Sequence, residues 1–204
     1  KEWGWMEDNI MSKVSKLREP RGRTRFLSDE ERNRFIRACR ESKNSDLYIA
    51  VILALSTGAR KNEIWGLSWK CVDLKNGFIT FMETKNDEPR SVPLTGHALE
   101  LMIERSKDPR IDTELVFPSR VDRHKHFDFR RPFEKALKVA QIEDFSWHNL
   151  RHSAASYLVM AGVDMRTVAE ILGHKTMQMT QRYAHLSPEH LKDATAKLNH
   201  KIFG

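Results

Sequence analysis

One short stretch of the chain has the residue pattern of β-strands, and it limits the possible folds more than any other feature. Residues 77–82 are rich in β-forming side chains, and a second such segment at 90–94 follows after a polar turn. A third strand is expected at 71–74. The sequence therefore predicts a small antiparallel sheet near residues 70–94.

Helical patterns cover most of the remaining chain. Ser28 and Glu31 form a capping box, which marks a helix start, and 47–55 is apolar on almost all sides, as in a buried helix. A short helix is expected near 60–67, after a break at 56–58. Further helices are predicted at 96–107, 129–140, 148–161, 166–172, 177–184 and 188–198. The predicted fold class is therefore α+β, mainly α.

The composition is typical of a soluble globular protein with a polyanionic partner. Of the 204 residues, 40% are hydrophobic and 31% charged, which is enough for one well-packed domain. The net charge of +7 suits nucleic acid or an anionic membrane surface. No apolar run approaches the roughly 20 residues of a membrane span.

Neither a signal peptide nor an initial Met is present, so we expect a fragment of a longer protein. Cys39 and Cys71 lack metal-ligand spacing, so we expect reduced thiols in a cytosolic protein.

The first 25 residues have the pattern of a tail and linker. Arg21, Arg23 and Arg25 are interleaved with a proline and a glycine, so this segment cannot build a core. It can lie along a phosphate backbone, and it can equally be a plain solvated linker. The folded domain is expected to occupy 26–204.

Arg60 follows a glycine-led turn and opens a short helix. Helix N-termini attract anions through their free N–H groups and the helix dipole, and an arginine there adds a bidentate fork for phosphate oxygens. Glu63, three residues later, can orient that guanidinium, and Lys61 is a further candidate contact to DNA. A plain surface pair of Arg60 and Glu63 is the commoner outcome of such spacing.

His148, Arg151 and His152 lie at helical spacing. His148 and Arg151 share one face of the expected helix. His148 and His152 also have the spacing of zinc ligands, but Asn149 stands where such a motif needs a Glu, and further ligands are missing. We therefore expect no metal at this motif, and we expect His152 to be a core histidine with a hydrogen-bonded ring.

Tyr183 comes nine residues after His174, which follows an expected helix cap at Gly173. On one uninterrupted helix, His174 and Tyr183 would be roughly 13 Å apart and on opposite faces. Both can serve one site only if the chain bends, for which 175–176 is suitable; otherwise Tyr183 serves the site of another subunit. Taken alone, Tyr183 could also be a packing aromatic.

Lys85, at the expected hairpin tip, is either solvated or able to reach a DNA backbone.

In this order, these motifs resemble the catalytic domain of the tyrosine recombinases, the phage integrase family. The resemblance runs from about residue 26 to about residue 198, and 1–25 is similar to the end of the family's core-binding domain and its linker. The matching motifs are 57–63, the hairpin at 84–85 with 90–94, 148–152, 172–174 and Tyr183.

The resemblance implies a transesterification of DNA that needs neither a metal nor another cofactor. Tyr183 would attack the scissile phosphate, leaving a 3′-phosphotyrosyl bond and a free 5′-hydroxyl. Arg60 and Arg151 would hold the non-bridging oxygens and stabilise the transition state, and His174 would add a hydrogen bond to them.

The resemblance also implies how protons move. His148 would help to take the tyrosine proton, and Lys85 would protonate the leaving 5′-oxygen. Glu63 would support Arg60. Asn149 stands where the family often has Asp, and it faces no expected chemistry.

The function implied first is integration and excision of a prophage or mobile element. Chromosome-dimer resolution and transposon movement use the same residues and stay open. A type IB topoisomerase is a further alternative, as is a DNA-binding module without catalysis, although the latter predicts the loss of an active-site residue and none is lost.

The implied partners are double-stranded DNA attachment sites, accessory DNA-bending or excisionase proteins, and further copies of the chain, with no membrane. A homotetramer on DNA would form through the C-terminal tail, where Leu191, Ala194 and Leu198 make one apolar stripe. The implied location is the cytoplasm of a bacterium, for a bacterial or phage-encoded protein.

Overall fold

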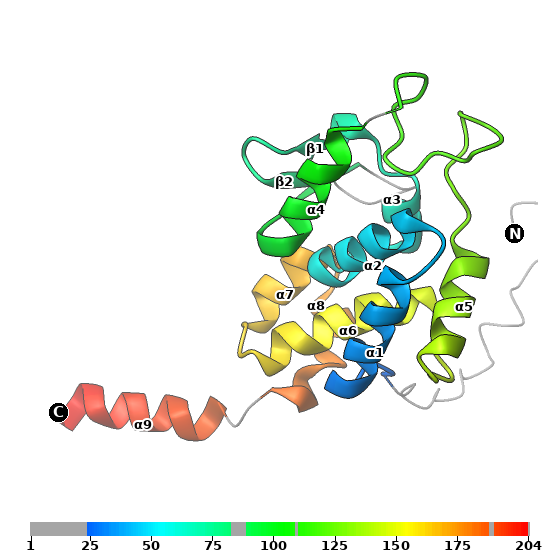
Figure 1. Cartoon of the computed structure of the whole chain (residues 1–204). Coiled ribbons are helices and arrows are strands. Elements are labelled where there is room, and N and C mark those ends of the chain that lie inside the picture. Colours follow the sequence, from blue (N-terminus) through cyan, green and yellow to red (C-terminus); the bar gives the residue numbers. More distant parts are fainter. Residues whose placement is uncertain (1–23, 83–88, 109, 188–189, 204) are drawn as a thin grey trace, which may run out of the picture.

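The computed structural model describes residues 24–82, 89–108, 110–187 and 190–203. Within these ranges, helices precede and follow a three-stranded antiparallel sheet (Figure 1). The helices are α1 Asp29–Arg40, α2 Ser45–Thr57, α3 Lys61–Trp65, α4 Gly96–Ser106, α5 Arg130–Val139, α6 Trp147–Met160, α7 Met165–Leu172, α8 Met177–Gln181 and α9 His190–Phe203. The strands are β1 Val72–Asp73, β2 Phe78–Phe81 and β3 Arg90–Pro93, and the short 3-10 turns are η2 Trp69–Cys71 and η3 Ala184–Leu186.

The sheet lies where the sequence predicts it. Its strand order is β1-β2-β3, and Ile79 in the middle strand lies opposite Val72 on one side and Val92 on the other. Ile79 and Val92 are buried, which fixes the register because a slip by one residue would turn them to solvent. The fold class, mainly α with a small antiparallel sheet, is confirmed.

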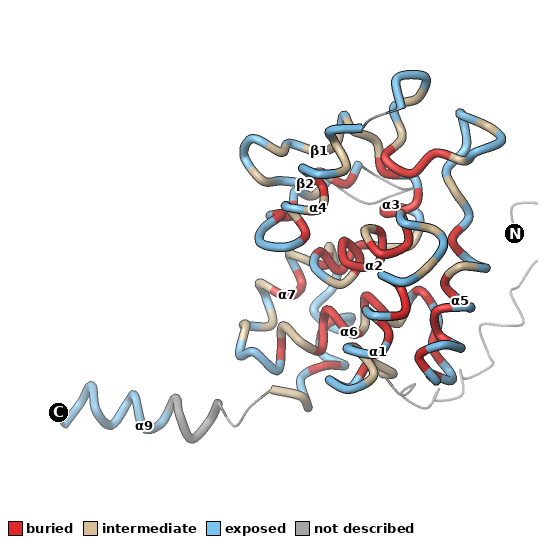
Figure 2. The backbone as a smooth tube through the Cα atoms, in the orientation of Figure 1, coloured by how far each residue is buried: buried red, intermediate tan, exposed pale blue. Residues whose placement is uncertain are grey.

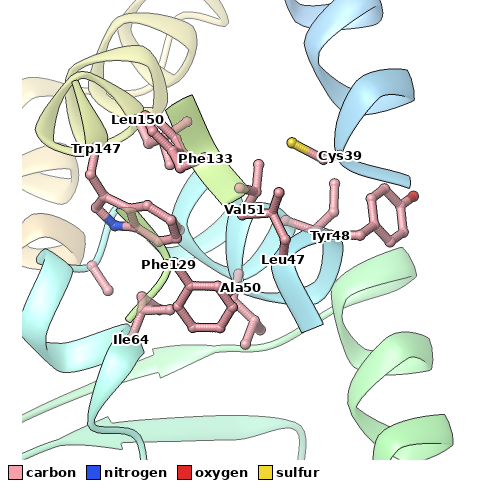
Figure 3. Packing of buried hydrophobic residues seen from close by; sticks show 14 of the residues in the cluster. Cys39, Leu47, Tyr48, Ala50, Val51, Ile64, Phe129, Phe133, Trp147 and Leu150 are labelled. Carbon is pink, nitrogen blue, oxygen red and sulfur yellow. The ribbon is translucent and has the colours of Figure 1, made fainter. Parts of the chain in front are cut away.

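The core is built around α2, which packs against α1, α4 and α6. Its apolar side chains face neighbours on all sides, as the sequence predicts for 47–55, and Figure 2 shows most of α2 as buried. Aromatic rings close the core beside it (Figure 3). The Trp147 ring centroid lies 5.1 Å from that of Phe133 and 5.3 Å from that of Trp65. This packing holds the first turns of α6 against α3 and α5.

Two helices at the C-terminal end differ from prediction. The segment predicted as one helix at 177–184 is helical only to Gln181, because the chain turns there to bury Tyr183. The last helix runs to Phe203 rather than to Leu198. The predicted helices at 96–107, 129–140, 148–161 and 166–172 agree with α4, α5, α6 and α7 within one residue at each end.

Helix α9 stands apart from the other helices in Figure 1. Its described side chains, from Thr195 to Phe203, are all exposed. No helix in the described part of the chain is long and apolar enough to cross a membrane.

Candidate functional site

Tyr183 is buried in its own domain, at the bend between α8 and η3. Only 2% of the residue is exposed, and its backbone N–H donates to the Thr180 carbonyl at 2.9 Å. The Tyr183 hydroxyl and the Nδ1 atom of His152 share a hydrogen bond of 2.5 Å. The ring packs in an apolar cluster on α6 and α7, formed by Ala155, Val159, Val168 and Leu172. In this structure Tyr183 therefore belongs to the site of its own chain.

The turn after α7 brings His174 to the same site. Gly173 ends α7 in the left-handed conformation, with φ 64° and ψ 52°, which favours glycine. A new helix, α8, starts at Met177, so the bend predicted at 175–176 is confirmed. The His174 ring bonds through Nδ1 to the hydroxyl of buried Thr180 at 2.7 Å. His174 and Tyr183 are thus held at the two ends of the short α8 segment.

Arg151, on α6, is a buried cation at the centre of the site. Only 5% of it is exposed, and Nη1 donates to the carbonyl of Gly58 at 2.8 Å. Burial, together with the positive charges of Arg60 and Arg90, lowers the pKa of Arg151 to about 10. Three guanidinium groups are therefore close enough to repel one another, and an anion bound among them would relieve that repulsion.

Gly58 brings the C-terminus of α2 close to α7. Its φ of 62° is left-handed, and a Cβ atom at this position would lie 2.3 Å from Cδ2 of Leu172. Only glycine satisfies both constraints. The close approach places the Gly58 carbonyl where it accepts a hydrogen bond from Arg151.

Glu63 supports Arg60, as predicted. Its carboxylate accepts from the Arg60 backbone N–H at 2.6 Å and from Arg60 Nη1 at 3.1 Å. The structure adds Arg90 from β3, whose two terminal nitrogens each donate to one Glu63 oxygen at 2.8 Å. Burial alone would raise the pKa of Glu63, but the hydrogen bond from Arg90, the Arg60 N–H and both positive charges hold it at about 2. Glu63 is therefore ionised at neutral pH.

The structure corrects the expectation for His152. Its ring is hydrogen-bonded, as expected, but the partner is the Tyr183 hydroxyl, so His152 belongs to the site rather than to the general core. The ring of His148, one turn earlier on α6, contacts the His152 ring edge-on, with 4.8 Å between centroids. His148 thus lies beside the histidine that bonds the tyrosine.

All three histidines favour the neutral form. Burial lowers the pKa of His152 and of His174 to about 4 each, with neighbouring positive charges adding to the effect. The pKa of His148 is also lowered, by burial and then by Arg151. At neutral pH the Nδ1 atom of His152 can therefore accept the hydroxyl proton of Tyr183.

The Tyr183 hydroxyl is protonated in this state. Burial raises its pKa, while the charges of Arg182 and Arg151 act in the opposite direction. A tyrosine in this environment attacks an electrophile only if a base takes its proton and cations stabilise the oxyanion. The His152 ring bonds the hydroxyl, and the charges of Arg182 and Arg151 act on it, so the site offers groups for both tasks.

Asn149 has a structural task. Its side chain accepts from the N–H of Ser146 at 2.7 Å and closes the capping box of α6. It also donates to the Arg25 carbonyl at 3.1 Å. These bonds fix the first turn of α6, which carries His148.

The structure describes two of the residues predicted to contact DNA, Arg25 and Lys61. Arg25 is ion-paired with Glu31, and its guanidinium lies over the Phe145 ring at 5.5 Å. The Lys61 ammonium lies over the Trp65 ring at 4.1 Å. Both stay predictions as DNA ligands. Three predicted residues lie outside the described part of the chain: Arg21, Arg23 and Lys85.

In the described ranges, no group of three or more His, Cys, Asp or Glu side chains could hold a metal ion. The positive charge of the site comes from its arginines. Together with the buried tyrosine and the neutral histidines, they make a site suited to binding a tetrahedral anion and attacking it with a phenol oxygen.

The model of the phage integrase family matches residues 25–190. The chain is 35% identical to the shufflon-specific DNA recombinase of Escherichia coli, over 91% of this chain and 46% of that protein. It is 32% identical to the integrase of Salmonella phage P22, over 100% of this chain and 54% of that protein. The chain thus spans about half the length of these curated relatives. The catalytic domain of bacteriophage HP1 integrase has the same fold, with a TM-score of 0.67 and 34% identity over 84% of this chain and 93% of that domain.

Proposed function

Because the chain belongs to the phage integrase family, we propose that it cuts and rejoins DNA at specific sites through a phosphodiester bond to Tyr183. The observation that carries this proposal is the position of the Tyr183 hydroxyl, which is bonded to a neutral histidine in a site rich in arginine. Phosphoryl transfer of this kind needs a positioned nucleophile and fixed positive charge, and the site offers both.

In the proposed reaction, the Tyr183 oxygen bonds to the scissile phosphorus and the bond from phosphorus to the 5′-oxygen breaks. Arg60 and Arg151 bind the non-bridging oxygens, where negative charge grows in the pentacoordinate transition state. His174 donates a further hydrogen bond to these oxygens. The product is a 3′-phosphotyrosyl bond, which keeps the energy needed to rejoin the strand.

The proton of Tyr183 passes to His152, because Nδ1 of that ring already bonds the hydroxyl. His148, whose ring lies against His152, shares the task that the family resemblance implies for it. Lys85 stays our candidate to protonate the leaving 5′-oxygen.

We propose integration and excision of a phage or mobile element as the biological role, since relatives include the integrases of Salmonella phage P22 and Haemophilus phage HP1. The alternative is chromosome-dimer resolution or transposon movement, because tyrosine recombinases named XerC are also relatives. DNA attachment sites, excisionase or DNA-bending proteins and a cytoplasmic location follow from either role. Residues 1–25 would link this catalytic domain to a core-binding domain.

The test is a covalent adduct on DNA. The full-length protein is incubated with nicked duplexes carrying its binding site, selected from a random-sequence pool, and the products are separated on a denaturing gel. We expect an adduct with the wild-type protein in the presence of EDTA and none with Tyr183→Phe. An adduct that persists in this variant would contradict the assignment of Tyr183, and an adduct that needs added Mg²⁺ would contradict the mechanism.

A second assay separates recombination from the alternative functions. Two copies of the site on one plasmid should recombine, whereas a type IB topoisomerase would relax the supercoils without exchanging the sites. A DNA-binding module would do neither and would still shift the duplex in a gel.

A further inference from the structure

The Glu63 carboxylate is shared by two arginines, and Arg90 holds it more closely than the Arg60 side chain does. Both terminal nitrogens of Arg90 donate to Glu63, one to each oxygen, at 2.8 Å. The Arg60 guanidinium reaches one oxygen, at 3.1 Å. The parallel fork is the strongest geometry between an arginine and a carboxylate. Arg90 therefore neutralises more of the Glu63 charge than the side chain of Arg60 does.

This sharing affects the charge that Arg60 can offer to a phosphate. The Glu63 side chain is 4% exposed, so its ionised carboxylate needs cationic partners. If Arg90 were absent, Arg60 would be its nearest cation, and the closer ion pair would turn the Arg60 guanidinium toward Glu63. With Arg90 present, the two arginines and one carboxylate carry a net charge of +1, so the negative charge of Glu63 is not set against Arg60 alone.

Arg90 also reaches the turn that carries His174. Its Nε atom donates to the carbonyl of Ile171 at 3.2 Å. That carbonyl lies in the last turn of α7, where helix carbonyls lack intrahelical partners and a cation is favourable. A Cβ atom on Gly173 would lie 2.7 Å from Cδ of Arg90, so the Arg90 side chain packs directly against this turn.

The position of Arg90 is fixed by its own surroundings. Its side chain is 12% exposed, and its guanidinium lies over the ring of Phe81, 4.8 Å from the centroid. Phe81 is also its partner in the pairing of β2 with β3. An arginine held by a strand pair, an aromatic ring, a carboxylate and a carbonyl has little freedom to reorient.

We propose that Arg90 is a positioning residue for DNA cleavage, which holds Glu63 away from a closer pair with Arg60 and braces the His174 turn. This inference rests on the proposed function, and it assigns to β3 a task in the chemistry. Arg90 acts through Arg60 and His174 and does not itself contact the phosphate.

The test is a double-mutant cycle on single-turnover cleavage by the full-length protein, with the selected nicked duplex as substrate. Arg90→Ala alone should slow cleavage about tenfold or more, whereas in an Arg60→Ala background, where only its action on the His174 turn remains, it should slow cleavage by a clearly smaller factor of about threefold or less. This loss of additivity is the mark of action through Arg60, because a residue that only stabilises the fold would slow both backgrounds by the same factor. Equal factors in the two backgrounds would overturn the inference.

Arg90→Lys keeps the charge but cannot form the parallel fork, so it tests the geometry in a variant that is less prone to unfold. We expect it to cleave more slowly than the wild type at an unchanged melting temperature. A wild-type rate in a folded Arg90→Lys protein would overturn the inference.

Arg105 provides a matched control. It is also mostly buried, pairs with Asp46 at 3.4 Å and donates to the Val116 carbonyl at 3.2 Å, but it lies on α4. Arg105→Ala should lower the melting temperature without slowing cleavage by the folded protein.

If the wild-type protein forms no adduct, the proposed function fails and the role of Arg90 fails with it. If the wild type cleaves and Arg90→Ala cleaves equally fast, the inference on Arg90 alone fails.

Discussion

The hydroxyl of Tyr183 is hydrogen-bonded to Nδ1 of His152, a residue that follows Arg151 directly in α6. One helix therefore presents a buried cation and a proton acceptor at consecutive positions. The histidine hydrogen-bonded to the tyrosine is His152, and the ring of His148 contacts the His152 ring edge-on.

Replacing His152 should impair cleavage more than DNA binding. His152→Gln keeps a polar partner for the tyrosine but removes the base, so we expect a loss of about 100-fold or more in the cleavage rate. Gel shift and single-turnover adduct formation measure the two effects. His97→Gln is the matched control, because His97 bonds the hydroxyl of Tyr48 at 2.8 Å away from the site. Equal cleavage rates for the two variants would contradict the role of His152.

Arg60→Ala and Arg151→Ala should each remove one transition-state donor. The expected loss is about 2.7–4 kcal/mol in the cleavage barrier, or about 100- to 1000-fold in rate. DNA affinity should fall less, because the chain has 35 Lys and Arg residues, many of which can contact the backbone. The measurement is the single-turnover rate at saturating protein. A rate within about twofold of wild type would show that the residue does not clamp the phosphate.

Stability should fall as the pH drops from about 6.5 to about 4. In the folded protein the pKa values of His152 and His174 are about 4, below the ordinary value of 6.5. The unfolded chain therefore binds more protons in this window, and each histidine removes at most about 1.4 kcal/mol of stability per pH unit. The urea midpoint measured across this range tests the sign. His152→Gln should flatten the curve, and an unchanged slope in that variant would contradict the lowered pKa of His152.

Gly58→Ala should destabilise the protein by about 2–4 kcal/mol, from the left-handed backbone and from the contact with buried Leu172. Gly96→Ala is the control for the backbone effect alone, because Gly96 also has a positive φ but a Cβ there meets nothing within 4 Å. It should cost about 1 kcal/mol. Urea denaturation compares the two variants, and equal losses would show that Leu172 moves aside freely.

Removing residues 187–204 should impair recombination between two sites and leave single-site binding largely intact. The described part of α9 exposes Leu198, Ile202 and Phe203, by 57%, 60% and 82%, and we propose that a neighbouring copy of the chain covers them. Gel shift and the two-site plasmid assay measure the two activities. Unchanged recombination by the truncated protein would rule out the tail as the contact between subunits.

The sequence predicted the elements whose evidence is local. The capping box of Ser28 and Glu31, the left-handed cap at Gly173 and the bend at 175–176 are all written within a few neighbouring residues, and all are present. The pairing of Arg60 with Glu63 was predictable for the same reason, since the two residues are three apart.

The features that the sequence did not predict depend on contacts between distant segments. His152 and Tyr183 are 31 residues apart, and Glu63 and Arg90 are 27 apart, so no helical or strand period connects them. The early end of α8 has the same origin, because burial of Tyr183 outweighs the helical propensity of the residues around it. A strand arginine two residues before a buried valine could have indicated Arg90, but only once the sheet was placed against α7.

The burial of Tyr183 also limits what this site can attack. Small phosphate compounds in the cell, such as nucleotides and sugar phosphates, bind through few contacts, so we expect them not to uncover a residue that is only 2% exposed. A long DNA duplex, which binds over a wide surface, can supply the free energy to do so. Under the proposed function, a covered nucleophile of this kind would be a safeguard for the genome, because DNA that is bound too loosely to uncover Tyr183 would keep its backbone unbroken.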